Sequence, residues 1–398
     1  MSINVARATA LMKAEGVDGI VAATLENNFY LSGVWDDGQE LFPHDSEFYT
    51  MATADAPDRG IVICSIGAAD LTLEGYSTLR DVVTFGTFFR DFMDGIPLDA
   101  DEEKVKKITM AHEVGRTSVD ALAEAINRLG LASSVVAVDE RGPNRNLLAI
   151  LAEKFPRAEF RPASGLLRSI RAVKMPDELE RVEQALRITE AGLRAAFAEF
   201  AEGVSEKAVQ NAFERTVAAE GARTGFCLVR FGRGLALGQI RPSESITLAA
   251  KDFAFFDVGV TYRGYRSDIG RLVSFGEPSD EIRSLFDASK AGQQVAIDMM
   301  RPAVVAKDVF TKAVEAVREA GIPSYQRQHV GHGIGIEYYD LPVLTPSSET
   351  VLEAGMVFEV ETPYYRPGVG GAFIEDTVVV TEGDPKIITT LSRDMIVL

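Results

Sequence analysis

The sequence predicts a mixed α/β fold, α/β (α+β), spread over roughly two domains. Its 398 residues exceed the ~100–200 residues usual for one domain. Apolar residues make up 46% and charged residues 25% of the chain, as in a globular protein with a full core rather than a disordered chain. Short apolar runs alternate with amphipathic helical segments in the first part, and the last part is rich in strand patterns.

The first part of the chain alternates helix and strand. Apolar residues recur at helical spacing in Val5, Ala8, Leu11 and Met12, and Gly16 ends this predicted helix. The elements predicted after it are apolar strands at 19–24, 61–64 and 135–138, a helix at 147–155 and an extended stretch near Phe160. This order is typical of helices that cover a sheet.

A change of pattern near residues 165–175 predicts two domains, 1–165 and 166–398. Pro176 suits the first turn of a helix, and the acidic residues after it suit the positive end of the helix dipole. The buried stripe of this long helix is Leu179, Val182, Leu186, Leu193, Phe197 and Phe200. Gly203 ends it, and Ser205 caps a second helix. Strand patterns dominate after Gly221, with helices expected at about 280–300 and 307–320.

Composition excludes several kinds of partner. The net charge is −18, from 41 basic and 59 acidic residues, and no basic run could displace counterions from a nucleic acid. No apolar run approaches the ~18 residues of a membrane span, and the N-terminus does not resemble a secretory signal. Cys64 and Cys227 are the only cysteines, too few for a disulfide framework or a thiolate metal site. We expect a cytoplasmic protein without nucleic-acid or membrane partners.

Three segments of the second half carry candidate ligands. Asp257 and Asp268 stand 11 residues apart in two apolar strands that read as one hairpin. His332 lies among glycines, which let the backbone approach a site closely. Glu361 and Glu375 face each other across a second predicted hairpin. A carboxylate within an apolar strand is costly unless it is paired or bound to metal.

Together these segments supply four carboxylates and one imidazole. Each residue alone has an ordinary reading as a turn, edge or strand residue, but the conjunction favours a metal site. Such a set suits hard or borderline divalent ions (Mn, Fe, Co or Zn), and its charge is sufficient for two of them.

The motifs of these segments resemble the pita-bread-fold family of prolidase, aminopeptidase P, methionine aminopeptidase and creatinase. They read D-x-G…Y-x-G-Y-x-S-D-I-x-R, G-H-G-I-G, G-M-V-F-x-V-E and I-E-D-T-V-V-V-T-E. The resemblance implies a small creatinase-like α/β domain before a pita-bread catalytic domain, a homodimer, and a short peptide or other small-molecule substrate. It also implies that Asp257, Asp268, His332, Glu361 and Glu375 hold two divalent metal ions.

The chain departs from the family around these ligands. Gln239 and Tyr339 stand where peptidases carry catalytic histidines, and Phe373 replaces an Arg. Glu359 is a further acidic residue in the G-M-V-F-E-V-E stretch. We therefore expect these four residues to line the substrate pocket, with Glu361, Tyr339 and His332 as catalytic residues.

The departures leave the reaction open. The favoured interpretation is an Xaa-Pro peptidase-like hydrolase that cleaves a C–N (amide) bond with a metal-bound hydroxide, with Glu361 as the proton acceptor. An acidic pocket with tyrosines also suits a small cationic or zwitterionic substrate, as for a creatinase-like hydrolase or a metal-dependent lyase. A catalytically inactive metal-binding interaction protein is the third interpretation.

The remaining histidines and the tryptophan receive weaker predictions. His44 and His112 are expected at the surface, and His329 is a candidate to support the metal site from behind. The segment NNFYLSG at 27–33 resembles a strand–turn signature of the family, and Trp35 after it belongs either to the core or to an interface.

Overall fold

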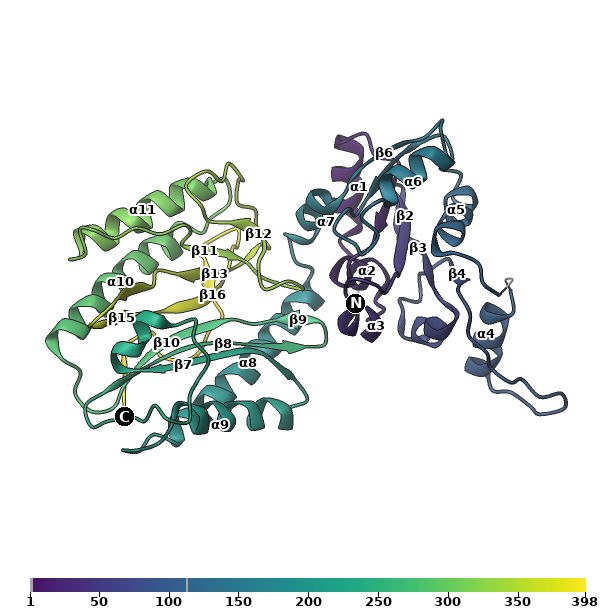
Figure 1. Ribbon diagram of the computed structural model, residues 1–398. Helices are drawn as coiled ribbons and strands as arrows, with labels where there is room; N and C mark the ends of the chain where they lie inside the picture. Colours follow the sequence, from purple (N-terminus) through teal and green to yellow (C-terminus); the bar gives the residue numbers. More distant parts are fainter. Residues whose placement is uncertain (1–2, 112–113) are drawn as a thin grey trace. The chain divides into compact units, whose positions relative to one another are not determined.

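The computed structural model describes residues 3–111 and 114–398 (Figure 1), so His112 lies outside the described residues. The chain divides into two compact units, Met1–Arg171 and Ala172–Leu398. Both contain helices and strands, which confirms the predicted mixed α/β class.

The first unit is built on a six-stranded mixed sheet in the order β4-β3-β2-β1-β5-β6. Its strands are β1 Gly19–Ala22, β2 Tyr49–Thr53, β3 Ala56–Ser65, β4 Asp81–Phe85, β5 Val135–Val138 and β6 Glu159–Pro162. The helices are α1 Val5–Ala14, α2 Leu25–Ser32, α3 Asp37–Leu41, η1 Ile66–Glu74, α4 Ala100–Thr109, α5 Ser118–Arg128, α6 Leu147–Lys154 and α7 Ser164–Arg171.

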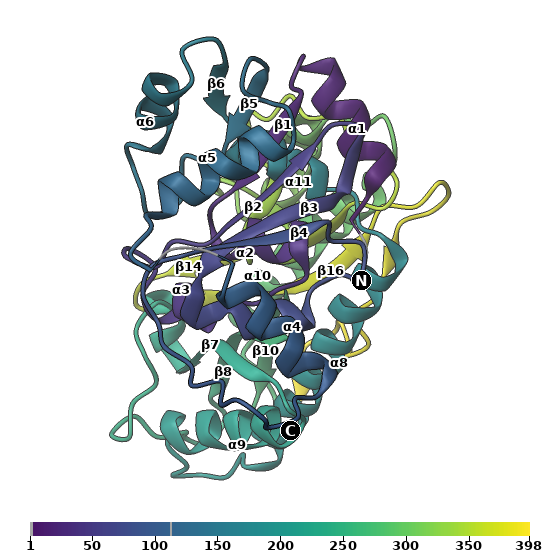
Figure 2. The same cartoon turned by 90° about the vertical axis from the view of Figure 1, so that its right-hand side faces the viewer.

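Both faces of this sheet are buried by alternating side chains. Ile61 and Ile63 of β3 join a core with α5 and α6, whereas Val62 and Cys64 pack on the other side with Val34. Strand alternation places these two pairs on opposite faces. Figure 2 shows α5 lying along the sheet.

The segment NNFYLSG forms helix α2 and the glycine that ends it, so the expected strand–turn is wrong. Gly33 takes the left-handed conformation (φ 76°) that ends a helix. Asn28 is buried and its amide donates to Phe48 O at 2.7 Å. Asn27 donates to Asp139 at 2.7 Å. These side-chain hydrogen bonds hold helix α2 to residues that lie outside the helix, Phe48 and Asp139.

The second unit carries two helix pairs and a ten-stranded sheet. The helices are α8 Pro176–Ala198, α9 Glu206–Ala219, α10 Asp280–Asp298 and α11 Ala306–Glu319, with the short 3-10 helix η2 Gly232–Leu237. The strands are β7 Arg223–Phe231, β8 Phe253–Tyr262, β9 Tyr265–Arg266, β10 Ile269–Ser274, β11 Gly331–Gly333, β12 Asp340–Val343, β13 Val357–Glu361, β16 Glu375–Val379, β17 Lys386–Ile387 and β18 Ile396–Val397.

The main path through this sheet runs β12-β11-β13-β16-β10-β8-β7. The pair α8–α9 packs against Phe256 and Val258 of β8, whereas α10 and α11 pack against Phe358 and Val360 of β13. Figure 1 shows the strands between these two helix pairs. A separate hairpin, β14 Tyr364–Arg366 and β15 Gly370–Ala372, lies between β13 and β16 in the sequence.

Most of the long predicted elements are confirmed. The helices expected at 5–16, 147–155, from 176, after 205, at 280–300 and at 307–320 correspond to α1, α6, α8, α9, α10 and α11. Ser205 caps α9 by accepting a hydrogen bond from Ala208 N at 3.1 Å. Helix α8 ends at Ala198, before Phe200 and Gly203. His44 is exposed, as expected. None of the described helices combines the length and apolar character needed to cross a membrane.

We predict that Asp139→Ala lowers the free energy of unfolding of the first unit by about 3 kcal/mol, because a buried carboxylate with several donors would be lost. Asp139 Oδ2 accepts bonds from Thr24 N at 3.0 Å, Thr24 Oγ1 at 2.9 Å and Asn27 Nδ2 at 2.7 Å. Urea unfolding followed by the fluorescence of Trp35, the single tryptophan, measures the change.

The matched control is Asp55→Ala, since Asp55 is an exposed partner of Lys13. It should change stability by less than about 0.5 kcal/mol. Equal effects of the two substitutions would contradict the role assigned to Asp139.

Candidate metal centre

A row of carboxylates crosses four neighbouring strands of the second unit. Asp257 of β8 lies opposite Gly270 of β10, and Gly270 lies opposite Glu375 of β16. Glu375 in turn lies opposite Glu361 of β13. Residues paired across strands point to the same side of a sheet, so Asp257, Glu375 and Glu361 share one face. We call this the metal face.

Asp268 and His332 extend the row. Asp268 stands just before β10, two residues from Gly270, and His332 of β11 lies opposite Glu359, two residues from Glu361. Donor atoms of Asp268, His332 and Glu375 all lie within 4.8 Å of one another, and the three residues are buried. Asp268, His332 and Glu375 thus form a donor cluster, and the strand register places Asp257 and Glu361, the other two residues predicted as ligands, in the same row.

The electrostatics of the row fit a divalent cation. Burial is the main cause that raises the pKa of Asp257, to about 8, and the charge of Glu361 adds to it. Burial and neighbouring carboxylates also raise the pKa of Asp268 and Glu375. Asp268 Oδ1 is buried with no hydrogen-bond partner among the described residues. Carboxylates this close ionise together only when positive charge compensates them, and an oxygen-rich set with one imidazole suits a divalent ion.

His332 is held in the form that binds metal. Burial lowers the pKa of its imidazole to about 4, so the ring is neutral at pH 7. Its Nδ1 lies 3.1 Å from Gly333 O. If Nδ1 carries the proton and donates there, Nε2, which is 3.9 Å from Glu375 Oε1, is the free donor atom.

Two cationic or polar groups meet Glu361 at the other end of the row. Arg327 Nη2 lies 3.3 Å from Glu361 Oε2, and His329 Nδ1 lies 3.3 Å from Oε1. The Tyr339 hydroxyl is 3.5 Å from His329 Nε2, and the Tyr339 ring stacks on His332 with 3.8 Å between centroids. Sequence reasoning missed Arg327, although its position two residues before His329 in the same motif was an available signal.

The predicted substrate residues have different surroundings. Tyr339 is 48% exposed, whereas Glu359 is fully buried and accepts from Thr377 Oγ1 at 3.0 Å. Phe373 is buried against Phe255 with 4.9 Å between centroids. Gln239 is exposed in a turn after η2. Of these four, Tyr339 has an exposed side chain in direct contact with a metal-face residue.

Gly270 explains the burial of Phe373. A Cβ at Gly270 would lie 2.0 Å from Phe373 Cε1, so the aromatic ring occupies the space that any side chain would need. The ring thereby covers the position between Asp257 and Glu375 in the row.

Comparison with known proteins gives a consistent assignment. The model of metallopeptidase family M24 matches residues 180–382. An Xaa-Pro dipeptidase of Lactobacillus delbrueckii subsp. lactis is 31% identical over 266 residues, which are 66% of this chain and 72% of that protein. An Xaa-Pro dipeptidase of Pyrococcus furiosus is 31% identical over 246 residues, which are 61% of this chain and 70% of that protein.

Solved structures share the fold over nearly the whole chain. The X-Pro aminopeptidase of Thermotoga maritima has a TM-score of 0.74 at 25% identity, with 99% of each chain covered. The Xaa-Pro dipeptidase of Bacillus anthracis has a TM-score of 0.79 at 24% identity, also over 99% of each chain.

We predict that the protein treated with a chelator loses stability as the pH rises from 6.5 to 8. A carboxyl group whose folded pKa is raised keeps its proton in the folded state after the unfolded chain has released it, so stability is lost between the ordinary value of 3.8 and about 8 for Asp257. His329 and His332, with pKa lowered from 6.5 to about 4, act in the opposite direction, but most of their effect lies below pH 6.5.

Melting temperatures at pH 6.5 and 8, with and without added Mn²⁺, check this prediction. The gain from Mn²⁺ should be larger at pH 8, because ligands must lose their protons to bind the ion. A gain that does not change with pH would contradict the assignment of the carboxylates as ligands.

Proposed function

The chain belongs to metallopeptidase family M24, and on that premise we propose that it hydrolyses the amide bond of short Xaa-Pro peptides at a centre of two divalent metal ions. The family match confirms the resemblance predicted from the motifs, together with the pita-bread fold and the class of metal-dependent hydrolase. The observation that supports the centre is the single row formed by Asp257, Glu375 and Glu361 with Asp268 and His332 beside it.

The five ligands have enough charge for two ions. Asp268, His332 and Glu375 form the closest cluster of donors, and Asp257 and Glu361 complete the set. Four carboxylates balance two divalent cations, which are Mn, Co, Zn or Fe by the chemistry of the donors. Bound ions of this kind activate a water molecule for attack and polarise a carbonyl group.

Glu361 is the proposed proton acceptor. Burial raises the pKa of its carboxyl group, whereas the Arg327 guanidinium lowers it. A carboxylate whose pKa is raised above its ordinary value is a stronger proton acceptor. The hydrogen bond from Arg327 orients Glu361 Oε2, and His329 Nδ1 lies 3.3 Å from Oε1.

Tyr339 is the proposed donor to the oxygen on which charge develops. Burial and the nearby carboxylates, Glu361 first among them, raise the pKa of its phenol well above the usual value. The hydroxyl therefore keeps its proton and donates a hydrogen bond. Because the ring also stacks on His332, the hydroxyl stays close to the metal face.

Arg327 favours a substrate with a free carboxylate. Its guanidinium lies beside Glu361 and its side chain is 11% exposed, so it can pair with the C-terminal carboxylate of a dipeptide. Glu359, the main reason to consider a cationic substrate, is fully buried and has its Thr377 contact. The geometry thus supports a dipeptide more than a cationic compound. A homodimer in the cytoplasm stays a prediction, and sedimentation of the full chain tests the dimer.

We predict that Arg327→Gln lowers kcat/KM at least about tenfold for an Xaa-Pro dipeptide, which corresponds to roughly 1.4 kcal/mol. For the same dipeptide with a C-terminal amide the loss should stay below about threefold, because the carboxylate partner of the arginine is absent. Steady-state kinetics of the Mn²⁺-loaded protein measures both.

Arg283→Gln is the control, since Arg283 pairs with Glu277 at an exposed site. It should leave both substrates unaffected. Equal losses on the acid and the amide in Arg327→Gln would mean that the arginine acts on Glu361 alone, and no hydrolysis of any Xaa-Pro peptide by the loaded parent would refute the proposed activity.

We also predict that Tyr339→Phe lowers kcat about 10-fold to 100-fold while Mn²⁺ affinity changes less than about twofold. The substitution removes the donor but keeps the ring on His332, and loss of one oxyanion donor typically costs 10²–10³-fold; we expect less because Tyr339 is 48% exposed. Kinetics and calorimetric titration of the metal separate the two effects. An unchanged kcat would exclude the proposed role.

A further inference from the structure

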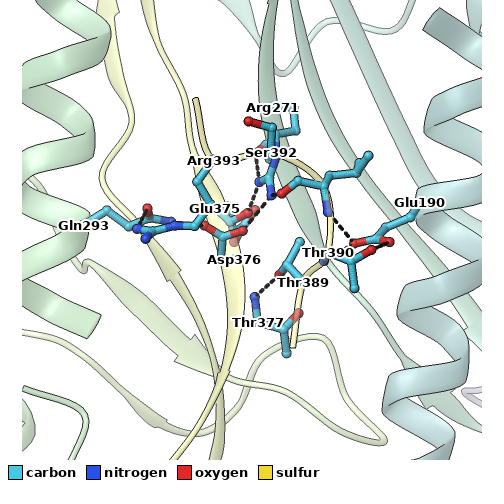
Figure 3. Close-up of polar contacts among 12 residues, drawn as sticks. Glu190, Arg271, Gln293, Glu375, Asp376, Thr377, Thr389, Thr390, Ser392 and Arg393 are labelled. Atoms are coloured by element: carbon cyan, nitrogen blue, oxygen red, sulfur yellow. Dashed lines mark hydrogen bonds and ion pairs between the residues drawn. The ribbon is translucent and has the colours of Figure 1, made fainter. Parts of the chain in front are cut away.

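The face of the sheet behind the metal centre carries a second polar cluster. Asp376 follows the ligand Glu375 in β16 and therefore points to the opposite face. Its carboxylate is fully buried and accepts three bonds: from Arg271 Nη2 at 2.6 Å, Gln293 Nε2 at 2.9 Å and Arg393 Nε at 3.0 Å. Figure 3 shows these side chains converging on Asp376.

This cluster also holds the main chain of the ligand. Arg271 Nη1 donates to Glu375 O at 2.6 Å and to Gly270 O at 2.8 Å. The two strands that carry the centre of the carboxylate row are therefore bonded to one guanidinium from behind. Arg271 therefore bonds both to the main-chain carbonyl of Glu375 and to the side chain of Asp376.

Arg393 comes from a C-terminal segment, residues 389–398, that runs across the back of these strands. Thr389 Oγ1 accepts from Thr377 N at 2.9 Å, and Leu391 N donates to Glu190 of α8 at 3.0 Å. Val397 in β18 pairs with Ser274 of β10. The segment thus bonds to α8 and to both central strands.

Arg393 connects this segment to the other helix pair. Its Nη1 donates to Gln294 Oε1 at 2.7 Å and its Nη2 to Gln293 Oε1 at 2.8 Å, both on α10. The side chain is 21% exposed, whereas Arg271 is 2% exposed. One planar guanidinium therefore joins α10 to the carboxylate of Asp376.

We propose that Arg393 is a positioning residue for the metal ligand Glu375, acting through Asp376 from the C-terminal segment. The proposal rests on the proposed metal centre. Outer partners fix the orientation of metal ligands, and their loss typically weakens metal affinity 10–100-fold. Without Arg393, Asp376 loses one of its two cationic partners and can turn, so Glu375 is less well placed to meet Asp268 and His332.

The test is calorimetric titration of the full-length, chelator-treated chain with Mn²⁺. Arg393→Gln should raise the Kd about tenfold. The control is Lys290→Gln, because Lys290 pairs with Asp394 of the same segment at an exposed site and has no contact with Asp376. It should change the Kd less than about twofold. The visible spectrum of the Co²⁺-loaded chain, which reports ligand geometry, should change in Arg393→Gln only.

An unchanged Kd and spectrum in Arg393→Gln would overturn the proposal even if its melting temperature fell, since that result shows a purely structural role. An equal loss of affinity in Lys290→Gln would overturn it too. If Arg393→Gln does not fold, Arg393→Lys is the deciding variant. It keeps the positive charge but loses the two guanidinium hydrogen bonds to Gln293 and Gln294 of α10. A Kd for Mn²⁺ about threefold higher than that of the parent supports the proposal, and a parental Kd refutes it. A parent chain that binds no Mn²⁺ would refute the metal centre itself.

Discussion

Compensation of buried negative charge is the constraint on which the second unit depends. Asp257, Glu375 and Glu361 occupy one row on the metal face, and burial raises the pKa of all three. In the absence of cations such a row holds protons, and with two divalent ions it becomes a set of ligands. On the opposite face Asp376 meets Arg271 and Arg393 instead. The same strands thus present carboxylates to the proposed metal centre on one side and to guanidinium groups on the other.

Buried acids elsewhere in the chain follow a different rule. Glu206 accepts from Arg230 Nη1, Phe231 N and Ser243 N at 2.8–3.0 Å. Asp139 is surrounded by donors in the same way. Hydrogen-bond donors of the protein itself stabilise these two carboxylates, and the role of both acids is structural. In contrast, Asp268 Oδ1 and Glu359 Oε2 are buried without a hydrogen-bond partner among the described residues, so protein donors leave one oxygen of each of these acids unsatisfied.

The sequence was sufficient for the parts of the site that lie within strands. Carboxylates interrupting apolar strands, with a Gly-flanked histidine, identified the five proposed ligands, and helical spacing identified α8 to α11. The sequence was insufficient where a site residue contacts a partner that is distant along the chain. Arg327 reaches Glu361 across 34 positions, and Arg271 reaches Asp376 across 105. Helix α2 was not predicted because the hydrogen bonds of its asparagines go to Asp139 and Phe48, which are distant in the sequence. The burial of Phe373 was not predicted because it depends on the absence of a side chain at Gly270.

The hairpin β14–β15 leaves the sheet at one proposed ligand and returns at another. Glu361 and Glu375 lie directly opposite each other, and the hairpin between them pairs only with itself among the described strands. Thr362, at its entry, is tied to Ser289 of α10 at 2.7 Å. Strand β15 is buried, and Ala372 and Phe373 belong to the core formed with α10 and α11. The segment between the two proposed ligands is therefore anchored to α10 at its entry and held in the core at its return, so a change in this packing would act on both carboxylates at once.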